Sequence, residues 1–521
     1  MSATATPPSP VEETAAALPE QPPTGGHIAA ILALARFETR ELLFQIQILV
    51  FFALEVLLVA LRMVRQEGMD DFPVLNTVDR ATQSAWPLFA IAVLVCTNAA
   101  ALRSRKHATE QQFGVLALEP WRRTVAHALS AVPFAALTAL VVAVEYLREA
   151  MKPGAIGHGS LGELAAAPLT VLLAGVTGVL LARALPSAFA PILFVIAFYL
   201  AMIMASAAGA GDNGWGWLSP ITLDVDKGGD PVPADLLGRP AAWHALYLVG
   251  LCVLVTCAAL LLSGGRTRAV KAATGLALAT TVAGAIGQLP HDTAALEAAR
   301  RTASEHPEKV QSCATYDGST YCAFPEWNGV RSEWAAVADR VRSLAGGTAA
   351  RTPLTIRQRI DTSGGVEVDG YLEPSATPGQ VTVSTRWGGN RVPEFAVGVA
   401  TVLVMGSEKA AESGGPLCDA RSVAIMWLAL GSDPTPMDTF QNVRLDDSTE
   451  GSGIVLAPTD PVSLTDHQTT VVRELLQRPG AEVTARVKSH WTELTSPATT
   501  TAEAAKLLGV PVPKGAESCD E

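Results

Sequence analysis

Long, uncharged apolar segments constrain this chain more than any other feature, and all of them lie before Pro290. A transmembrane helix needs about 20 consecutive, mainly apolar residues to cross the hydrocarbon core of a bilayer. The sequence therefore predicts an α-helical polytopic membrane bundle of about 6–7 spans. The last predicted span, rich in Ala, Gly and Thr, has an alternative interpretation as a tether lying against the bundle. The predicted spans are Phe44–Val64, Trp86–Leu102, Val125–Leu147, Leu164–Ala182, Ser187–Ala208, Trp243–Leu262 and Ala272–Leu289.

The chain after Pro290 differs, because charged residues recur every few positions and no apolar segment approaches the length of a span. Overall, 49% of the residues are hydrophobic and 17% are charged, which is too apolar for an ordinary soluble chain of 521 residues. We predict a disordered cytoplasmic tail over 1–26, an interfacial amphipathic helix over 27–43, a transmembrane domain over 44–290 and a soluble extracytoplasmic α+β domain over 291–521.

The soluble domain is predicted to begin with a helical stalk. A helix around Trp334 follows, and then three alternating runs at 355–361, 365–372 and 380–386 that indicate a small antiparallel sheet. The segment 431–461 is rich in Asp, Pro, Ser and Gly, which is typical of a surface loop. Further helices are predicted over Glu394–Met405, Val423–Leu430, His467–Leu476, Ala481–Leu494 and Thr501–Leu508.

Basic residues are unevenly divided between the two sides of the bundle. They gather in the second, fourth and sixth connections, whereas the first and fifth connections are acidic. The positive-inside rule then places the amino terminus in the cytoplasm and the soluble domain outside the cell membrane. Arg62, Arg65, Arg148 and Lys152 lie on the outer side and run against the rule. The residues that set the orientation are Arg103, Arg105, Lys106, Arg122, Arg123, Arg183, Arg266, Arg268 and Lys271.

Cysteine positions agree with this orientation. Three of the seven cysteines fall inside predicted spans, where a thiol is a small apolar group, and four lie in the soluble domain. An even number in an extracytoplasmic domain predicts disulfides. We predict that Cys313 pairs with Cys322 around a tight loop and, by remainder, Cys418 with Cys519. Four free thiols or another connectivity are the alternatives, and a zinc site is disfavoured because neither CxxC nor HExxH occurs.

Two segments on the predicted cytoplasmic side are amphipathic. The segment from His27 to Phe44 is predicted to lie in the membrane interface, with a cytoplasmic extension of the first span as the alternative. The second connection begins in a basic cluster, has an amphipathic stretch around Phe113 and is broken at Pro120, which indicates a short helix against the membrane. The first segment's apolar face holds Ile28, Ile31, Leu32, Ala35 and Leu42.

These segments resemble parts of the membrane subunit of type-2 ABC exporters. The resemblance lies in an elbow, LARFETRELL, and in a basic connection with R-x-R near its start and Pro and R-T before the third span. The layout also resembles actinobacterial permease-like proteins with an appended extracytoplasmic domain, in CATYDGSTYCAFPEW and RVKSHWTEL. In type-2 exporters this connection forms a coupling helix that docks on an ATPase. The docking residues that the resemblance implies are Glu110, Gln111, Phe113, Leu116, Arg122 and Arg123. The seventh span and the outer domain depart from the family.

Sequence motifs for catalysis are missing. The chain has no G-x-x-x-x-G-K-[ST] phosphate loop and no G-x-S-x-G elbow, and its nine histidines lack metal-ligand spacing. We therefore expect no enzyme activity, no cofactor and no metal, so that any ATPase must be a separate chain. We also expect a homo- or heterodimer in the membrane and no nucleic-acid partner.

Two groups of acidic residues have competing interpretations. Glu55 falls within the first span, where a charge is expensive, so it either faces a polar cavity or partner helix, or is protonated or reaches toward the interface. Asp446, Asp447 and Glu450 are predicted to form an exposed acidic loop, with cation binding as the alternative.

Taken with the resemblance, these features predict a permease-type subunit of an ABC export or resistance system. The rival hypothesis is a transmembrane sensor or assembly protein whose outer domain binds an extracellular ligand.

Overall fold

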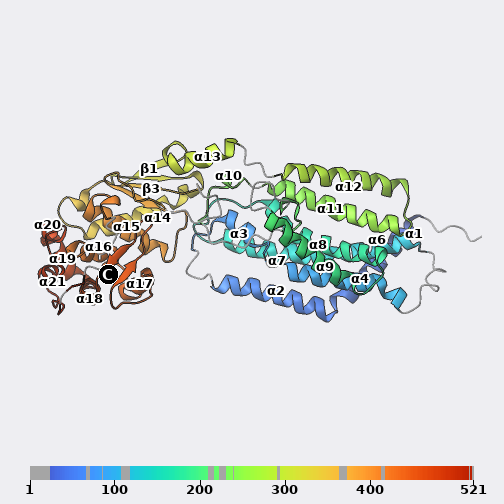
Figure 1. The fold of residues 1–521 in the computed structure, drawn as a ribbon, viewed down its shortest axis with the longest axis horizontal. Coiled ribbons are helices and arrows are strands. Elements are labelled where there is room, and N and C mark those ends of the chain that lie inside the picture. The colour runs from blue at the N-terminus through green and yellow to red at the C-terminus, as the bar shows by residue number, and fades with distance from the viewer. Residues whose placement is uncertain are drawn as a thin grey trace, which may run out of the picture.

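The computed structural model describes residues 24–65, 71–84, 86–106, 118–208, 216–221, 230–238, 240–289, 294–362, 372–411, 417–515 and 517–518. The molecule is elongated and mainly helical (Figure 1). A helical bundle forms one half, and the carboxyl-terminal half combines helices with two small sheets.

Within the described residues, six helical segments are long and apolar enough to cross a membrane. They are α2 (Ile46–Arg65), α4 (Pro87–Lys106), α6 (Pro120–Leu129) continued by α7 (Val132–Ala150), α8 (Leu161–Ala184), α11 (Ala241–Leu262) and α12 (Arg268–Gly287). These six correspond to six of the seven predicted spans. The fifth predicted span is the apolar helix α9 (Ala190–Ala208), whose described side chains, Ala190–Met204, fall short of that length.

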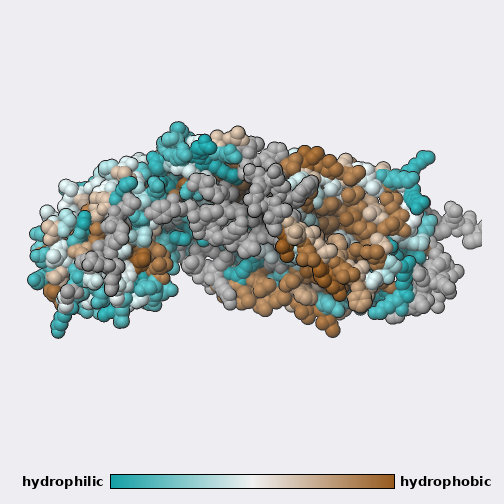
Figure 2. Space-filling view, in the orientation of Figure 1, coloured by the Kyte–Doolittle hydropathy of each residue, from teal (hydrophilic) through white to brown (hydrophobic). Residues whose placement is uncertain are grey.

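The bundle shows a broad hydrophobic surface, with hydrophilic residues at the end that carries α1 (Figure 2). Leu57, Leu140, Leu193 and Leu276 are each at least 50% exposed on this surface. Such exposure of large apolar side chains is what a lipid-facing surface requires. The composition of the helices and the location of their exposed apolar residues indicate a multi-pass membrane protein.

Small residues let the bundle helices approach closely. A Cβ atom on Gly250 of α11 would lie 2.5 Å from Thr281 Oγ1, and one on Gly284 of α12 would lie 2.5 Å from Tyr247 N. These two helices therefore pack backbone against backbone, as small residues permit in membrane bundles. The predicted span from Ala272 is thus part of a regular helix that packs along α11.

Short elements connect the bundle helices. At one end lies α1 (Thr24–Leu43), which ends before α2 begins at Ile46. At the other end, beside the soluble half, lie α3 and α10 (Figure 1), and η1 lies in the connection between α9 and α10. Their bounds are Leu75–Ala81 for α3, Ala234–Leu237 for α10 and Gly216–Leu218 for η1.

The carboxyl-terminal half begins with α13 (Ala294–Glu305), at the predicted stalk. Its other helices are η2 (Pro307–Lys309), η3 (Pro325–Val330), α14 (Arg331–Leu344), η4 (Ala349–Arg351), α15 (Arg391–Met405), η5 (Lys409–Ala411), α16 (Ala420–Leu430), α17 (Pro436–Val443), α18 (Asp466–Leu476), α19 (Gly480–Ser489), α20 (Trp491–Leu494) and α21 (Thr501–Leu508). Its strands are β1 (Ser312–Tyr316), β2 (Ser319–Ala323), β3 (Thr355–Gln358), β4 (Gln380–Val383), β5 (Gly453–Val455) and β6 (Val462–Leu464).

The larger sheet is mixed, so the prediction of a small antiparallel sheet is wrong. Its order is β1-β2-β3-β4; β1 and β2 are antiparallel, whereas β2, β3 and β4 run parallel. The reason is that α14 lies between β2 and β3 in the chain, and a crossover through a helix returns the chain parallel. The predicted run at 365–372 lies outside the described residues except for Leu372. Among the described strands, the two-stranded sheet β5-β6 is wholly antiparallel.

The segment 431–461 is not merely a surface loop, because it contains α17 and β5. Phe440 and Val443 of α17 are fully buried in the core of the soluble half. Some of the residues that suggested a loop lie at the start of this helix, with Pro436 in the first turn of α17. Proline is favoured at this position, because the first N–H groups of a helix have no intrahelical partner.

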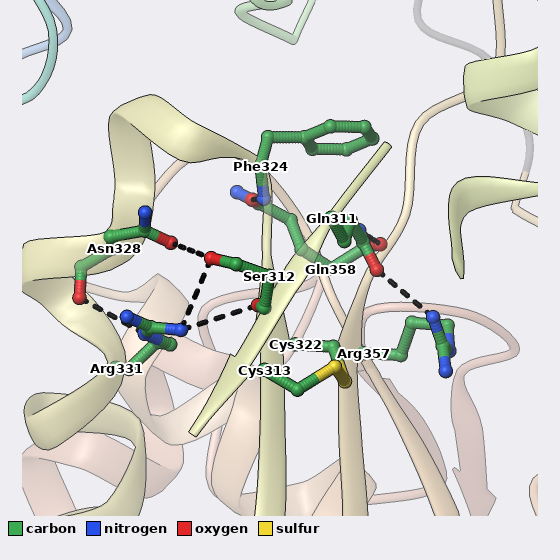
Figure 3. Close-up of a disulfide and its surroundings, with 9 residues drawn as sticks. All are labelled: Gln311, Ser312, Cys313, Cys322, Phe324, Asn328, Arg331, Arg357 and Gln358. Carbon is green, nitrogen blue, oxygen red and sulfur yellow. Dashed lines mark hydrogen bonds between the residues drawn. A yellow bond between two sulfur atoms is a disulfide. The ribbon is translucent and has the colours of Figure 1, made fainter. Parts of the chain in front are cut away.

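Strands β1 and β2 form a hairpin closed by the Cys313–Cys322 disulfide, as predicted (Figure 3). The two cysteines are directly opposite in the strand register. The turn between the strands places Asp317 at φ 44° and Gly318 at φ 80°, and two positive φ values match the twist of a tight hairpin. Arg331 donates to the carbonyl oxygen of Ser312 at 3.2 Å, which ties the hairpin to the start of α14.

Candidate functional site

Most of the predicted docking connection lies outside the described residues. This applies to Glu110, Gln111, Phe113 and Leu116. The remaining two predicted residues, Arg122 and Arg123, lie in the first turn of α6, at the same end of the bundle as α1. Arg122 Nε lies 3.2 Å from Glu119 Oε2, and its guanidinium carbon lies 5.3 Å from the ring centroid of Trp121.

An ion pair joins α1 to the start of this connection. Arg103, in the last turn of α4, lies 3.6 Å from Glu38 and 3.9 Å from Glu41 of α1. Glu38 is only 6% exposed, and burial raises the pKa of its carboxyl group, although the Arg103 charge opposes the rise. Helix α1 also packs against α6. It therefore contacts the two helices that flank the predicted docking connection.

Glu55 is fully buried on α2. Its carboxyl oxygens make no well-formed hydrogen bond within the described part of the chain. The backbone N–H of Phe89, in the first turn of α4, faces the carboxyl group. The first turn of a helix presents unpaired N–H groups and a positive dipole end, which favour a carboxylate. Glu55 thus packs against the neighbouring helix α4. That its carboxyl group is protonated stays a prediction.

A polar network at the end of the bundle beside the soluble half was not predicted from the sequence. Arg62 of α2 lies 3.2 Å from Glu145 of α7, and it also donates to the carbonyl oxygen of Ala81 at 3.1 Å. On the next turn of α7, Glu149 lies 3.0 Å from Arg148 and 2.6 Å from Lys152. The signal for these pairs was a set of opposite charges near the same ends of two spans, but sequence alone did not show which helices are neighbours.

The soluble half is joined to the bundle by a shared hydrophobic core. Val74, Ile156 and Leu236 come from loops between bundle helices, yet they belong to the same buried cluster as Trp327 of the soluble half. Ile156 is 1% exposed, and its backbone pairs with Pro73 and Leu75. We call this contact the seam and define it by Val74, Ile156, Leu236 and the partners described next.

Polar contacts reinforce the seam. The backbone N–H of Ala234 donates to Glu326 at 2.7 Å, and Arg300 Nε donates to the carbonyl oxygen of Leu236 at 2.9 Å. Burial raises the pKa of Glu326, although the hydrogen bond from Ala234 opposes the rise. Because both apolar and polar groups cross it, the seam holds the soluble half against the bundle rather than leaving it on a tether.

A cleft of about 250 Å³ lies beside the seam. Arg386 on its wall lies 3.0 Å from Asp230, which belongs to the connection between α9 and α11. Glu394 is 5% exposed and lies 2.8 Å from Arg391. Burial raises the pKa of Glu394, and the Arg391 charge opposes this. The cleft thus holds two arginines and two carboxylates that span both halves of the molecule.

The remaining predicted cysteine pair is described in part. Cys418 is disulfide-bonded, whereas its predicted partner Cys519 lies outside the described residues. Cys96, Cys252 and Cys257 are buried thiols in the bundle helices.

Arginine organises the acidic segment that holds Asp446, Asp447 and Glu450. Arg444 is fully buried, donates to Asp446 at 3.0 Å and to the carbonyl oxygens of Glu450 and Ser452 at 3.1 Å each. Hydrogen bonding to Arg444 lowers the pKa of Asp446. The Arg444 guanidinium therefore supplies positive charge to these oxygens. Among the described side chains, no group of three or more His, Cys, Asp or Glu is placed to bind a metal ion.

Comparison with known proteins gives no relative: no family model, curated protein or solved structure matches this chain.

Proposed function

We propose that this protein is the permease-type membrane subunit of an ABC export or resistance system, driven by a separate cytoplasmic ATPase. The observation that carries the proposal is the contact of α1 with both α4 and α6, through the Arg103–Glu38 ion pair and through packing. A displacement of the connection between α4 and α6 would be transmitted to α1 and to both of these bundle helices. This is the mechanical requirement for coupling to a nucleotide-driven partner.

The proposed orientation places α1 in the cytoplasm and the soluble half outside the cell membrane. Figure 1 supports it, because α1 and the soluble half lie at opposite ends of the bundle. The Cys313–Cys322 disulfide also supports it, since disulfides persist in oxidising compartments. We further propose that two membrane subunits assemble as a homo- or heterodimer and that this chain has no catalytic centre of its own.

The seam favours a second candidate, a transmembrane sensor or assembly protein. Ligand binding in the cleft between Asp230 and Arg386 would act on both halves at once. A sensor needs such a rigid link between its ligand site and its membrane helices. It does not need an ATPase.

Co-purification from native membranes in mild detergent separates the two candidates. The proposal predicts that an ABC ATPase co-purifies with the wild-type protein. Phe113→Asp would place a charge against an apolar pocket, costing about 2 kcal/mol or more, so the ATPase should be lost at an unchanged level of this protein. Leu445→Asp is a matched control, because Leu445 is 64% exposed on the soluble half. Recovery of the wild-type protein without any ATPase, even at low salt, would contradict the proposal and favour the sensor.

A further inference from the structure

A narrow apolar groove lies between α4, α8 and α9. It has a volume of about 90 Å³ and is lined by Leu94 of α4, Ala174 of α8, and Phe194 and Phe198 of α9. The two phenylalanine rings stack with their centroids 6.1 Å apart and form one wall. Because these helices belong to the hydrophobic surface of the bundle in Figure 2, hydrocarbon is the solvent that surrounds the groove.

The groove continues into a second, smaller cavity at the end of the bundle beside the soluble half. The two cavities share Pro87, Thr170 and Pro220 in their walls, and the second has a volume of about 10 Å³. This is close to the space that one water-sized group occupies. Trp86 lines it, is 1% exposed, and its indole Nε1–H has no hydrogen-bond partner among the described residues. A buried donor without a partner costs free energy, so an acceptor that enters the cavity would gain a hydrogen bond from Trp86.

His244 lines the same small cavity and supplies the complementary group. Gln288 Nε2 donates to the carbonyl oxygen of Trp217 at 2.9 Å, which fixes Gln288 Oε1 as an acceptor. His244 Nδ1 lies 2.9 Å from that Oε1, so the neutral imidazole has its proton on Nδ1. His244 Nε2 is then an acceptor, and it too has no partner in the described part of the chain.

We propose that the groove and the small cavity together bind a single-chain amphiphile with a hydroxylated head group. Its hydrocarbon chain occupies the apolar groove. A head-group hydroxyl accepts a hydrogen bond from Trp86 and donates one to His244, because a hydroxyl is both donor and acceptor. Because the groove has a volume of only about 90 Å³, we commit to an occupant with one hydrocarbon chain. The proposal does not rest on coupling to an ATPase.

Photo-crosslinking in lipid nanodiscs tests the proposal. The probe is a monoacylglycerol with a diazirine in its acyl chain, and the labelled peptides are identified by mass spectrometry. We expect concentrated labelling of α4, α8 and α9. Unlabelled monoacylglycerol should compete roughly three- to tenfold better than the methyl ester of the same fatty acid, which lacks hydroxyl donors, because one or two hydrogen bonds are lost. Labelling spread evenly over all lipid-facing helices, or equal competition by the two compounds, would overturn the proposal.

Two variants separate chain binding from head-group recognition. Ala174→Trp fills the groove and should abolish the concentrated labelling, whereas Ala279→Trp on the exposed face of α12 is the matched control and should not. His244→Phe keeps an aromatic ring but removes the acceptor for the head-group hydroxyl, so labelling should persist while the preference over the methyl ester falls. Size-exclusion profiles and the background labelling of α12 show that each variant is folded. Unchanged labelling in Ala174→Trp, or an unchanged preference in His244→Phe, would contradict the proposed site.

Discussion

The two ends of the helical bundle are built differently. At the end that carries α1, the predicted docking connection is flanked by basic residues, and α1 is held by its packing against α6 and by the ion pair between Arg103 and Glu38. At the opposite end, loops between the helices enter the hydrophobic core of the soluble half. One end is thus arranged as a polar surface, and the other is closed by a buried seam.

Three of the four basic residues that run against the predicted positive-inside pattern are paired with carboxylates. Arg62 is paired with Glu145, and both Arg148 and Lys152 are paired with Glu149. The fourth exception is Arg65, whose side chain lies outside the described residues. Ion pairs also occur at the α1 end, where Arg103 lies 3.6 Å from Glu38 and Arg122 lies 3.2 Å from Glu119. Because the rule counts basic residues and not net charge, pairing does not remove the exceptions, and the orientation stays a prediction.

The largest expected effect is at the seam. Ile156→Ala removes a side chain that is 1% exposed in the shared core, and such truncations cost about 2–5 kcal/mol. We expect a lower melting temperature in detergent and faster proteolytic separation of the two halves. Leu445→Ala, at a 64% exposed position, should change stability by less than about 0.5 kcal/mol. Equal melting of Ile156→Ala and wild type would show that the halves are only tethered.

Loss of the disulfide should have the next largest effect and should be confined to the soluble half. Replacing both Cys313 and Cys322 by Ser releases the constraint on the unfolded hairpin, which is worth about 2–3 kcal/mol. Denaturant unfolding of the soluble half measures this loss. Non-reducing peptide mapping of the wild-type protein supplies the control, and free thiols at both positions would refute the pairing.

The Arg62–Glu145 pair should contribute less, because Arg62 is about one-third exposed. Glu145→Gln is expected to destabilise the bundle by about 1–2 kcal/mol, since it leaves the guanidinium without its partner. In a double-mutant cycle with Arg62→Met, the two losses should be less than additive by about 1 kcal/mol. Strict additivity would mean that the pair does not help to hold α2 against α7.

The smallest expected effect is a pH dependence at the seam. Burial raises the pKa of Glu326 above its ordinary value of 4.5, so the folded state holds the proton more tightly than the unfolded state. This contribution to stability is fully present below pH 4.5 and is lost as the pH rises through the raised pKa. Glu326→Gln keeps an acceptor for Ala234 N–H and should remove this dependence, with a change below about 1 kcal/mol. An unchanged pH profile of melting in the variant would exclude Glu326 as the cause.

Sequence analysis predicted the features that depend on local composition. Spans follow from runs of apolar residues, and the disulfide follows from the short separation of Cys313 and Cys322 around a tight loop, whereas strands β1 and β2 on either side of that loop were not predicted. The seam could not be predicted, because Val74, Ile156 and Leu236 lie in connections between the spans, where no local periodicity marks them as core residues. Their partners lie far away in the chain.

The sequence also did not predict which elements pair with each other. The parallel arrangement of β2 and β3 depends on how α14 crosses the sheet. The hydrogen bonds of Arg444 depend on the carbonyl groups of Glu450 and Ser452, which come close to its guanidinium only in the folded segment. In the bundle, Trp86 and His244 belong to two separate predicted spans, far apart in the sequence. Their common cavity appears only once the helices are assembled.

Reporter fusions test the central claim, that the two ends of the bundle face opposite sides of the membrane with the soluble half outside. Alkaline phosphatase is fused after Gly264, between α11 and α12, and in a second protein after Glu521. The reporter is active only where its disulfides can form. The account predicts an inactive enzyme at Gly264 and an active enzyme at Glu521. The reverse result would invert the orientation, and activity at both sites would contradict the separation of the two ends.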